Sequence, residues 1–147
     1  MRQIAADKQL PADIDAQPLV RAAAALQPAI RDHLDQINRE QRLPKALVEK
    51  FHAAGFYNMT IPRELGGLQV DPLTYLRVVE LLAEAAGSVG WNLCNNSIAQ
   101  LVTLGLPDEG VQELYAQRRD TPIAGTAVMG GGRAVPVEGG YRVTGGW

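Results

Sequence analysis

The chain has 147 residues, a length typical of one domain, and 46% of them are hydrophobic, which is enough for a buried core. A formal net charge of -2 gives no general attraction to nucleic acid or to an anionic membrane surface. The single cysteine, Cys94, excludes an internal disulfide and is typical of a reducing compartment. Because Met1–Leu10 lacks the apolar segment of a signal peptide, we expect a cytoplasmic protein without membrane or nucleic-acid partners.

Apolar residues recur at helical spacing from Pro18 to Gln117, which predicts a series of amphipathic helices. The longest pattern begins at Pro18 and continues to Gln41 without a break, so we expect one long helix there. Prolines at first helical positions, and glycines or prolines after last ones, set the other bounds. The predicted helices cover residues 18–41, 44–55, 72–86, 88–105 and 107–117. Together they predict a helical domain over residues 1–120.

The stretch Gly87–Pro107 carries no charged residue, and the rest of the chain is organised around it. Ser88 is the expected N-cap of its helix. Burying an amide without a partner costs about 1–3 kcal/mol, so the asparagines of this helix need hydrogen-bond partners nearby. They either cap neighbouring backbone or form the wall of a pocket. The candidate substrate-pocket residues, which share one side with Ala99, are Trp91, Asn92, Asn95 and Asn96.

The character of the sequence changes after Asp120. Thr121–Val128 predicts a strand, and the glycine-rich run 129–133 predicts a loop. Two further strands, 134–137 and 141–144, are joined by a turn at 138–140. So small a sheet is marginal by itself. We therefore expect residues 121–147 to be the start of a truncated β-barrel-like domain.

No catalytic set is complete, and the sequence identifies no catalytic residue. His33 is interpreted as a solvated side chain and His52 as semi-exposed, and neither has a second ligand at metal-site spacing. Cys94 has no base beside it, which favours a core position. The glycine-rich run lacks the Lys-Ser/Thr ending of a phosphate-binding loop. The sequence predicts no metal site.

Two motifs resemble the acyl-CoA dehydrogenase fold. Ile61–Gly67 is similar to its P-x-x-x-G-G loop between early helices, and Gly139–Trp147 is similar to its hairpin at the flavin. Gly87–Trp91 and Gly132–Ala134 resemble one branch more closely, the two-component flavin-dependent monooxygenases. The resemblance implies a mainly α chain: an N-terminal helical bundle followed by the first strands of a β domain.

The resemblance also implies a function. The intact family would oxygenate an aromatic or heteroaromatic small molecule with O2 and reduced flavin, FMN or FAD, delivered by a flavin reductase partner. By the same resemblance Thr126, Gly132 and Trp147 would contact the cofactor, and the asparagine-bearing helix would line the substrate side. The intact family is expected to form a homotetramer. This chain alone is expected to be inactive and not to retain flavin.

Two alternatives stay open. One is an acyl-CoA dehydrogenase, which would use FAD for α,β-oxidation, although Thr126-Ala127-Val128 lacks the acid and proline of that family's T-E-P sequence. The other is a non-catalytic helical fragment or interaction module.

Overall fold

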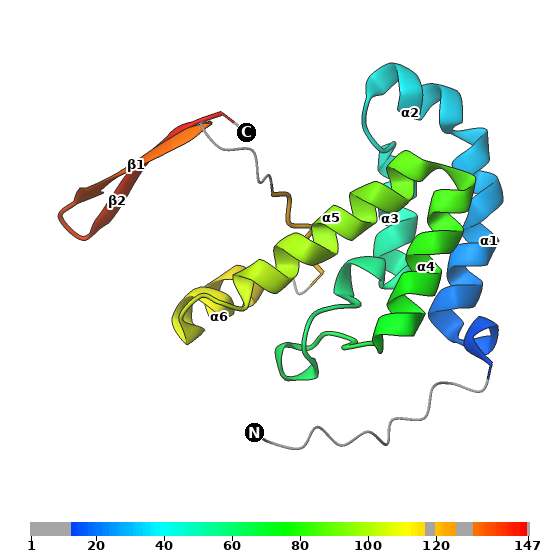
Figure 1. Ribbon diagram of the computed structural model, residues 1–147, viewed down its shortest axis with the longest axis horizontal. Helices are drawn as coiled ribbons and strands as arrows, with labels where there is room; N and C mark the ends of the chain where they lie inside the picture. Colours follow the sequence, from blue (N-terminus) through cyan, green and yellow to red (C-terminus); the bar gives the residue numbers. More distant parts are fainter. Residues whose placement is uncertain (1–12, 117–119, 126–130, 147) are drawn as a thin grey trace.

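The computed structural model describes residues 13–116, 120–125 and 131–146 (Figure 1). These residues form six α-helices, three short 3₁₀ helices and a two-stranded sheet. The helices are η1 (Ile14–Ala16), α1 (Pro18–Asp32), α2 (Leu34–Glu40), α3 (Lys45–Ala54), η2 (Phe56–Asn58), η3 (Arg63–Leu65), α4 (Pro72–Ala85), α5 (Gly87–Thr103) and α6 (Asp108–Ala116). The strands are β1 (Gly132–Val137) and β2 (Gly140–Gly145). The prediction of a mainly α chain is confirmed.

The core lies where α1 and α5 pack on either side of α4 (Figure 1), and α3 and η2 contribute side chains to the same core. Phe51 and Phe56 meet edge to face there, with ring centroids 5.4 Å apart. Each fully buried aliphatic or aromatic side chain contributes roughly 1.5–3 kcal/mol, so burial of the core side chains supplies most of the stability. The largest fully buried apolar side chains are Val20, Ile30, Leu47, Phe51, Phe56, Met59, Ile61, Val78, Leu82, Val89 and Leu93.

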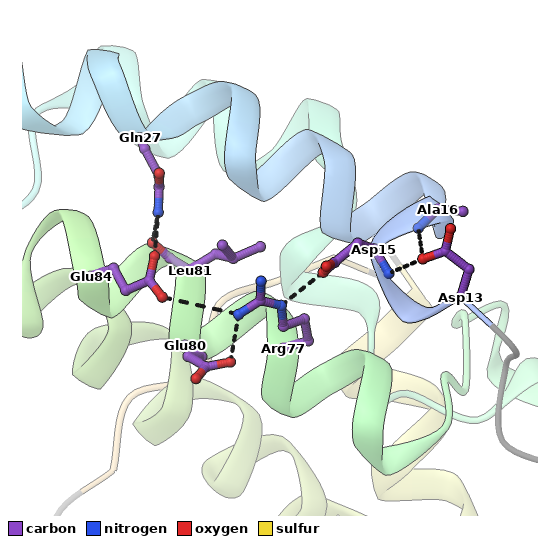
Figure 2. Close-up of polar contacts among 8 residues, drawn as sticks. All are labelled: Asp13, Asp15, Ala16, Gln27, Arg77, Glu80, Leu81 and Glu84. Atoms are coloured by element: carbon purple, nitrogen blue, oxygen red, sulfur yellow. Dashed lines mark hydrogen bonds and ion pairs between the residues drawn. The ribbon is translucent and has the colours of Figure 1, made fainter.

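Polar contacts hold α1 in register with α4 (Figure 2). The amide of Gln27 donates to the carbonyl oxygen of Leu81 at 2.7 Å and to the Glu84 carboxylate at 3.1 Å. One turn earlier on α4, the Arg77 guanidinium donates to Asp15 of η1 at 2.9 Å. Exposed ion pairs contribute little net stability. These contacts therefore specify how the two helices align, while burial provides the energy.

The long predicted helix 18–41 is wrong, because the structure breaks it at His33. The ring Nδ1 of His33 lies 2.7 Å from the carbonyl oxygen of Ala29, and because a carbonyl only accepts, the ring donates this bond. The backbone N–H of His33 reaches Ile30 O instead, at 3.1 Å. The histidine is half-buried rather than solvated, and its side chain replaces a helical backbone bond.

The predicted N-cap of the chargeless helix is also wrong. α5 begins at Gly87, with Ala86 in the cap position and no side chain capping it. Ala86 has an extended backbone that turns the chain sharply out of α4. Ser88 is thereby placed inside the first turn, exposed to solvent. A tight corner between consecutive helices therefore fixes where this helix starts.

The loop 61–70 needs both of its glycines. Gly66 has φ of 81°, in the left-handed region that glycine adopts at no steric cost. A Cβ on Gly67 would collide with the carbonyl oxygen of Ile61. The chain then turns back, so that the N–H groups of Leu68 and Val70 donate to Asn58 and Met59. The motif is thus a compact turn held by backbone bonds.

The strand predicted over Thr121–Val128 is wrong over the residues that can be checked. Residues 121–125 form no strand, and 126–128 lie outside the described residues. The predicted hairpin is confirmed with slightly longer strands, paired antiparallel from Gly132↔Gly145 to Val137↔Gly140. All its residues are exposed, and in Figure 1 the ribbon stands away from the helices. Among the described residues, no helix is long and apolar enough to cross a bilayer.

Gly90 provides a first test of this packing. A Cβ at this position would lie 2.6 Å from Cβ and 2.9 Å from Cα of Ala83 on α4. We expect Gly90→Ala to destabilise the fold by about 1–3 kcal/mol, because the two helices would have to separate. Urea unfolding followed by circular dichroism measures this.

The matched control is Gly87→Ala, since a Cβ at Gly87 meets nothing within 4 Å. That change should be neutral or slightly stabilising, because alanine favours a helix. Equal destabilisation by both variants would contradict a close approach at Gly90.

Candidate functional site

Two adjacent rows of side chains run along α5, and they hold the predicted substrate-pocket residues. Residues three or four apart share a helix side, so Trp91, Asn95, Ile98 and Val102 form one row. This row is uncovered: the side chains of Trp91 and Val102 are 65% and 73% exposed. Ile98 is also exposed, and Asn95 is half-buried. The result is a largely apolar strip on a helix without charges.

The second row consists of Asn92, Asn96, Ala99 and Thr103, and its members differ in burial, with Ala99 and Thr103 half-buried. Asn92 is exposed, whereas Asn96 is 8% exposed. Oδ1 of Asn96 accepts no hydrogen bond within the described part of the chain, which costs about 1–3 kcal/mol. The three predicted pocket amides therefore lie at different depths: Asn92 is exposed, Asn95 is half-buried and Asn96 is buried. Their burial differs because each amide points in a different direction from the axis of α5.

Asn92 lines a small cleft of about 150 Å³ between the start of α5 and the turn from α2 to α3. Ser88 lies beside it, one turn earlier on the same helix. Polar groups dominate the opposite wall, where the Arg42 guanidinium is also paired with Glu40. The cleft is lined by Ile37, Asn38, Gln41, Arg42, Leu43, Ser88 and Asn92. Of the four candidate pocket residues, Asn92 is the one that this cleft includes.

Gln100 is the buried amide that the sequence analysis missed. Its Nε2 donates to the carbonyl oxygens of Tyr57 at 2.7 Å and Thr121 at 3.3 Å. Its Oε1 accepts from the Thr60 hydroxyl at 3.1 Å. The side chain is 1% exposed, and both of its ends are satisfied. The spacing Asn92–Asn96–Gln100 could have indicated it, because it continues the same row of amides toward the core.

Tyr75 of α4 lies under α5, next to Cys94 and Ser97. Burial raises the pKa of the Tyr75 phenol to about 12, and the neighbouring thiol adds to the rise. Cys94 is half-buried, so the expected core position is only partly correct. A phenol with so high a pKa stays neutral at physiological pH and serves here as a packing and hydrogen-bonding group.

The hairpin presents one polar face. Alternation along paired strands puts Arg133, Val135, Arg142 and Thr144 on the same side, around an open hollow of about 540 Å³. Gly131 and Gly132 also line this hollow, at the start of β1. Within the described residues, neither guanidinium forms an ion pair. Two free cations beside glycine backbone and a hydroxyl make a donor set that fits the phosphate or ring oxygens of a flavin.

Of the three residues proposed to contact the cofactor, Gly132 can be placed, whereas Thr126 and Trp147 lie outside the described residues. His52 is 14% exposed, and its Nδ1 lies 2.6 Å from Oδ2 of Asp120. That pair spans 68 positions, and local patterns carry no signal for it. No group of three or more His, Cys, Asp or Glu side chains among the described residues is arranged to hold a metal ion.

Residues 17–112 match the family model described as the acyl-CoA dehydrogenase N-terminal domain. The chain belongs to this family. This confirms the resemblance inferred from the Ile61–Gly67 loop and the hairpin.

Relatives of this acyl-CoA dehydrogenase N-terminal domain are flavin-dependent monooxygenases. The chain is 36% identical over 137 residues to HsaA of Mycobacterium tuberculosis, the oxygenase subunit of a flavin-dependent monooxygenase, and the match covers 90% of this chain and 34% of HsaA. It is 29% identical over 128 residues to the indole-3-acetate monooxygenase of Pseudomonas putida, covering 86% and 32%.

Solved structures agree with this acyl-CoA dehydrogenase-like fold. The HsaA monooxygenase from M. tuberculosis superposes with a TM-score of 0.79 at 30% identity, over 89% of this chain and 36% of that one. XiaF from Streptomyces sp., solved in complex with FADH2 and glycerol, superposes with a TM-score of 0.81 at 27% identity, over 86% and 32%. The chain spans about a third of the length of these relatives.

Tyr75 allows a test of the packing beneath α5. Because burial raises its pKa to about 12 from an ordinary value of about 10, the folded protein holds a proton that the unfolded chain loses first. The contribution of Tyr75 to stability is thus complete below about pH 10 and is lost as the pH rises toward 12. Burial also raises the pKa of Tyr57, so alkaline titration of tyrosinate absorbance should show late ionisation from both tyrosines, and Tyr75→Phe should make the late step smaller. A late step of equal size in that variant would contradict the placement.

Proposed function

We propose that this chain supplies the N-terminal helical part of a flavin-dependent monooxygenase that hydroxylates an aromatic or heteroaromatic small molecule, using reduced flavin and O2. The match to HsaA over 90% of the chain at 36% identity carries the proposal. The runs that resemble the monooxygenase branch, 87–91 and 132–134, are local signals in the same direction. The proposal concerns a whole protein and not this chain alone, because the chain matches only 34% of the length of HsaA.

In this proposal the chargeless helix forms one wall of the substrate pocket. Trp91 offers a flat, exposed ring on which an aromatic substrate can stack. Ile98 and Val102 continue the wall with apolar surface that excludes water, a condition that favours productive oxygenation. Asn92 and Asn95 offer amides that can orient a polar group of the substrate, and Asn96 lies deeper in the same wall.

The polar face of the hairpin is the proposed contact with the flavin. Arg133 and Arg142 would hold its anionic or carbonyl oxygens, and Gly132 would let the ring system approach the backbone. The complex of XiaF with FADH2 favours FAD, and FMN is the alternative. When bound, the reduced flavin supplies the electrons that O2 needs.

The proposal extends to organisation and partners. A domain boundary near residue 120 would separate the helical domain, 1–120, from the first part of a β domain, 121–147. The name "oxygenase subunit" given to HsaA supports a separate flavin reductase as partner. A homotetramer is the proposed assembly of the intact protein.

A chimera tests the function directly. Residues 17–146 would replace the matching third of M. tuberculosis HsaA, and the chimera would receive reduced flavin, isotopically labelled O2 and a panel of phenols and indoles. We expect a labelled hydroxylated product that requires the reduced flavin, detected by mass spectrometry. A folded, flavin-loaded chimera that oxygenates none of the panel would count against the proposal.

Trp91→Ala in that chimera should lower the product formed per flavin oxidised several-fold and raise hydrogen peroxide release, because the wall would admit water. Leu76→Ala is the matched control, since Leu76 is an exposed apolar residue on α4 and not on α5, the helix that forms the wall. Equal losses in the two variants would remove Trp91 from the pocket.

The family match also favours a second candidate, an acyl-CoA dehydrogenase. Anaerobic mixing of the flavin-loaded chimera with acyl-CoA thioesters separates the two functions. Bleaching of the oxidised flavin would support the dehydrogenase, and an unchanged spectrum would support the monooxygenase. The chain by itself should stay colourless after incubation with flavin and desalting, because it offers only an open hairpin face.

A further inference from the structure

The segment that follows α6 is held to the helical body at two consecutive residues. The first is Asp120, whose Oδ2 lies 2.6 Å from Nδ1 of His52 on α3. Because an ionised carboxylate only accepts, the histidine donates, and such charge-assisted bonds are stronger than neutral ones. The two side chains are 14% and 28% exposed, so water screens this contact less than it screens the surface ion pairs.

The second contact is a hydrogen bond to Thr121. Its carbonyl oxygen accepts from the buried amide of Gln100 on α5, which also donates to the carbonyl oxygen of Tyr57. The ring of Tyr57 in turn lies against His52, with ring centroids 4.7 Å apart. We call His52, Tyr57, Gln100, Asp120 and Thr121 the anchor. Its parts come from α3, η2, α5 and the segment itself, and they touch one another.

The anchored segment leads toward the hairpin. It stays close to α5 as far as Gly125, where a Cβ would lie 3.4 Å from Cβ of Ala99. The chain then reaches Gly131–Arg133, the start of the polar hairpin face. No anchor residue belongs to that face. The position of residues 120–125 therefore limits where the chain can place the proposed flavin contacts, while none of those contacts is an anchor residue.

We propose that His52 is a positioning residue: through Asp120 it fixes where the chain leaves the helical body and thereby places the hairpin face against the flavin. This rests on the proposed function. His52 acts through the segment and touches neither the flavin nor the substrate.

The position of residues 120–125 relative to the helices is measured in the 147-residue chain and not in the chimera. Spin labels at Ala24→Cys on α1 and Ala124→Cys, both at exposed sites, would report the distance between helical body and segment in a Cys94→Ser background. His52→Leu removes the donor, whereas His52→Asn keeps an N–H near the position of Nδ1. We expect the distance distribution to become about twice as broad in His52→Leu and to stay narrow in His52→Asn. Asp120→Ala provides a second way to break the pair if His52→Leu unfolds.

Flavin binding is measured in the chimera. We expect His52→Leu to raise the flavin dissociation constant about tenfold, the scale of one lost charge-assisted hydrogen bond, with His52→Asn within about twofold of the parent. Leu76→Ala should leave the constant unchanged. Unchanged affinity in His52→Leu, or an unchanged distance distribution, would overturn the positioning role. A parent chimera that folds but binds no flavin would instead overturn the proposed function, and the distance measurement would still decide whether His52 holds the segment.

Discussion

A single buried amide sets the geometry on which the rest of the structure depends. Gln100 uses its two N–H groups and its carbonyl oxygen to join α5, the turn after α3 and the segment after α6. A side chain without that donor and acceptor pattern would leave the buried carbonyl oxygen of Tyr57 without this hydrogen bond. An unsatisfied buried acceptor lowers the free energy of unfolding. The chargeless helix therefore has one defined rotation, and this rotation decides which of its residues face outward.

The apolar core sets the position of the same helix along its axis. α5 follows α4 after one extended residue, and Gly90 lets the two axes approach at Ala83. With this turn between α4 and α5, Val89 and Leu93 are buried in the core and Trp91 points away from it. The exposed strip of α5 thus follows from packing on the opposite side together with the hydrogen bonds of Gln100.

Much of this arrangement could be predicted from local sequence. Pro18, Pro72 and Gly55 marked helix bounds correctly, because their backbone preferences act over one turn. The break at His33 could not be predicted, since the apolar spacing continues across it and a ring-to-carbonyl bond decides the outcome. The depth of Asn96 and the pairing of His52 with Asp120 depend on tertiary contacts, which a spacing pattern does not contain. The family, in contrast, was recognisable from two glycine-bearing motifs.

The hairpin carries a consequence for handling the chain in isolation. Opposite its arginine face, the ribbon presents Ala134, Pro136, Tyr141 and Val143 to solvent, with both strand edges unpaired within the described residues. Exposed strands of this kind are templates for intermolecular pairing, and Pro136 removes one donor from the ladder. Protein concentration, more than the stability of the helices, will then govern how long a preparation remains monodisperse.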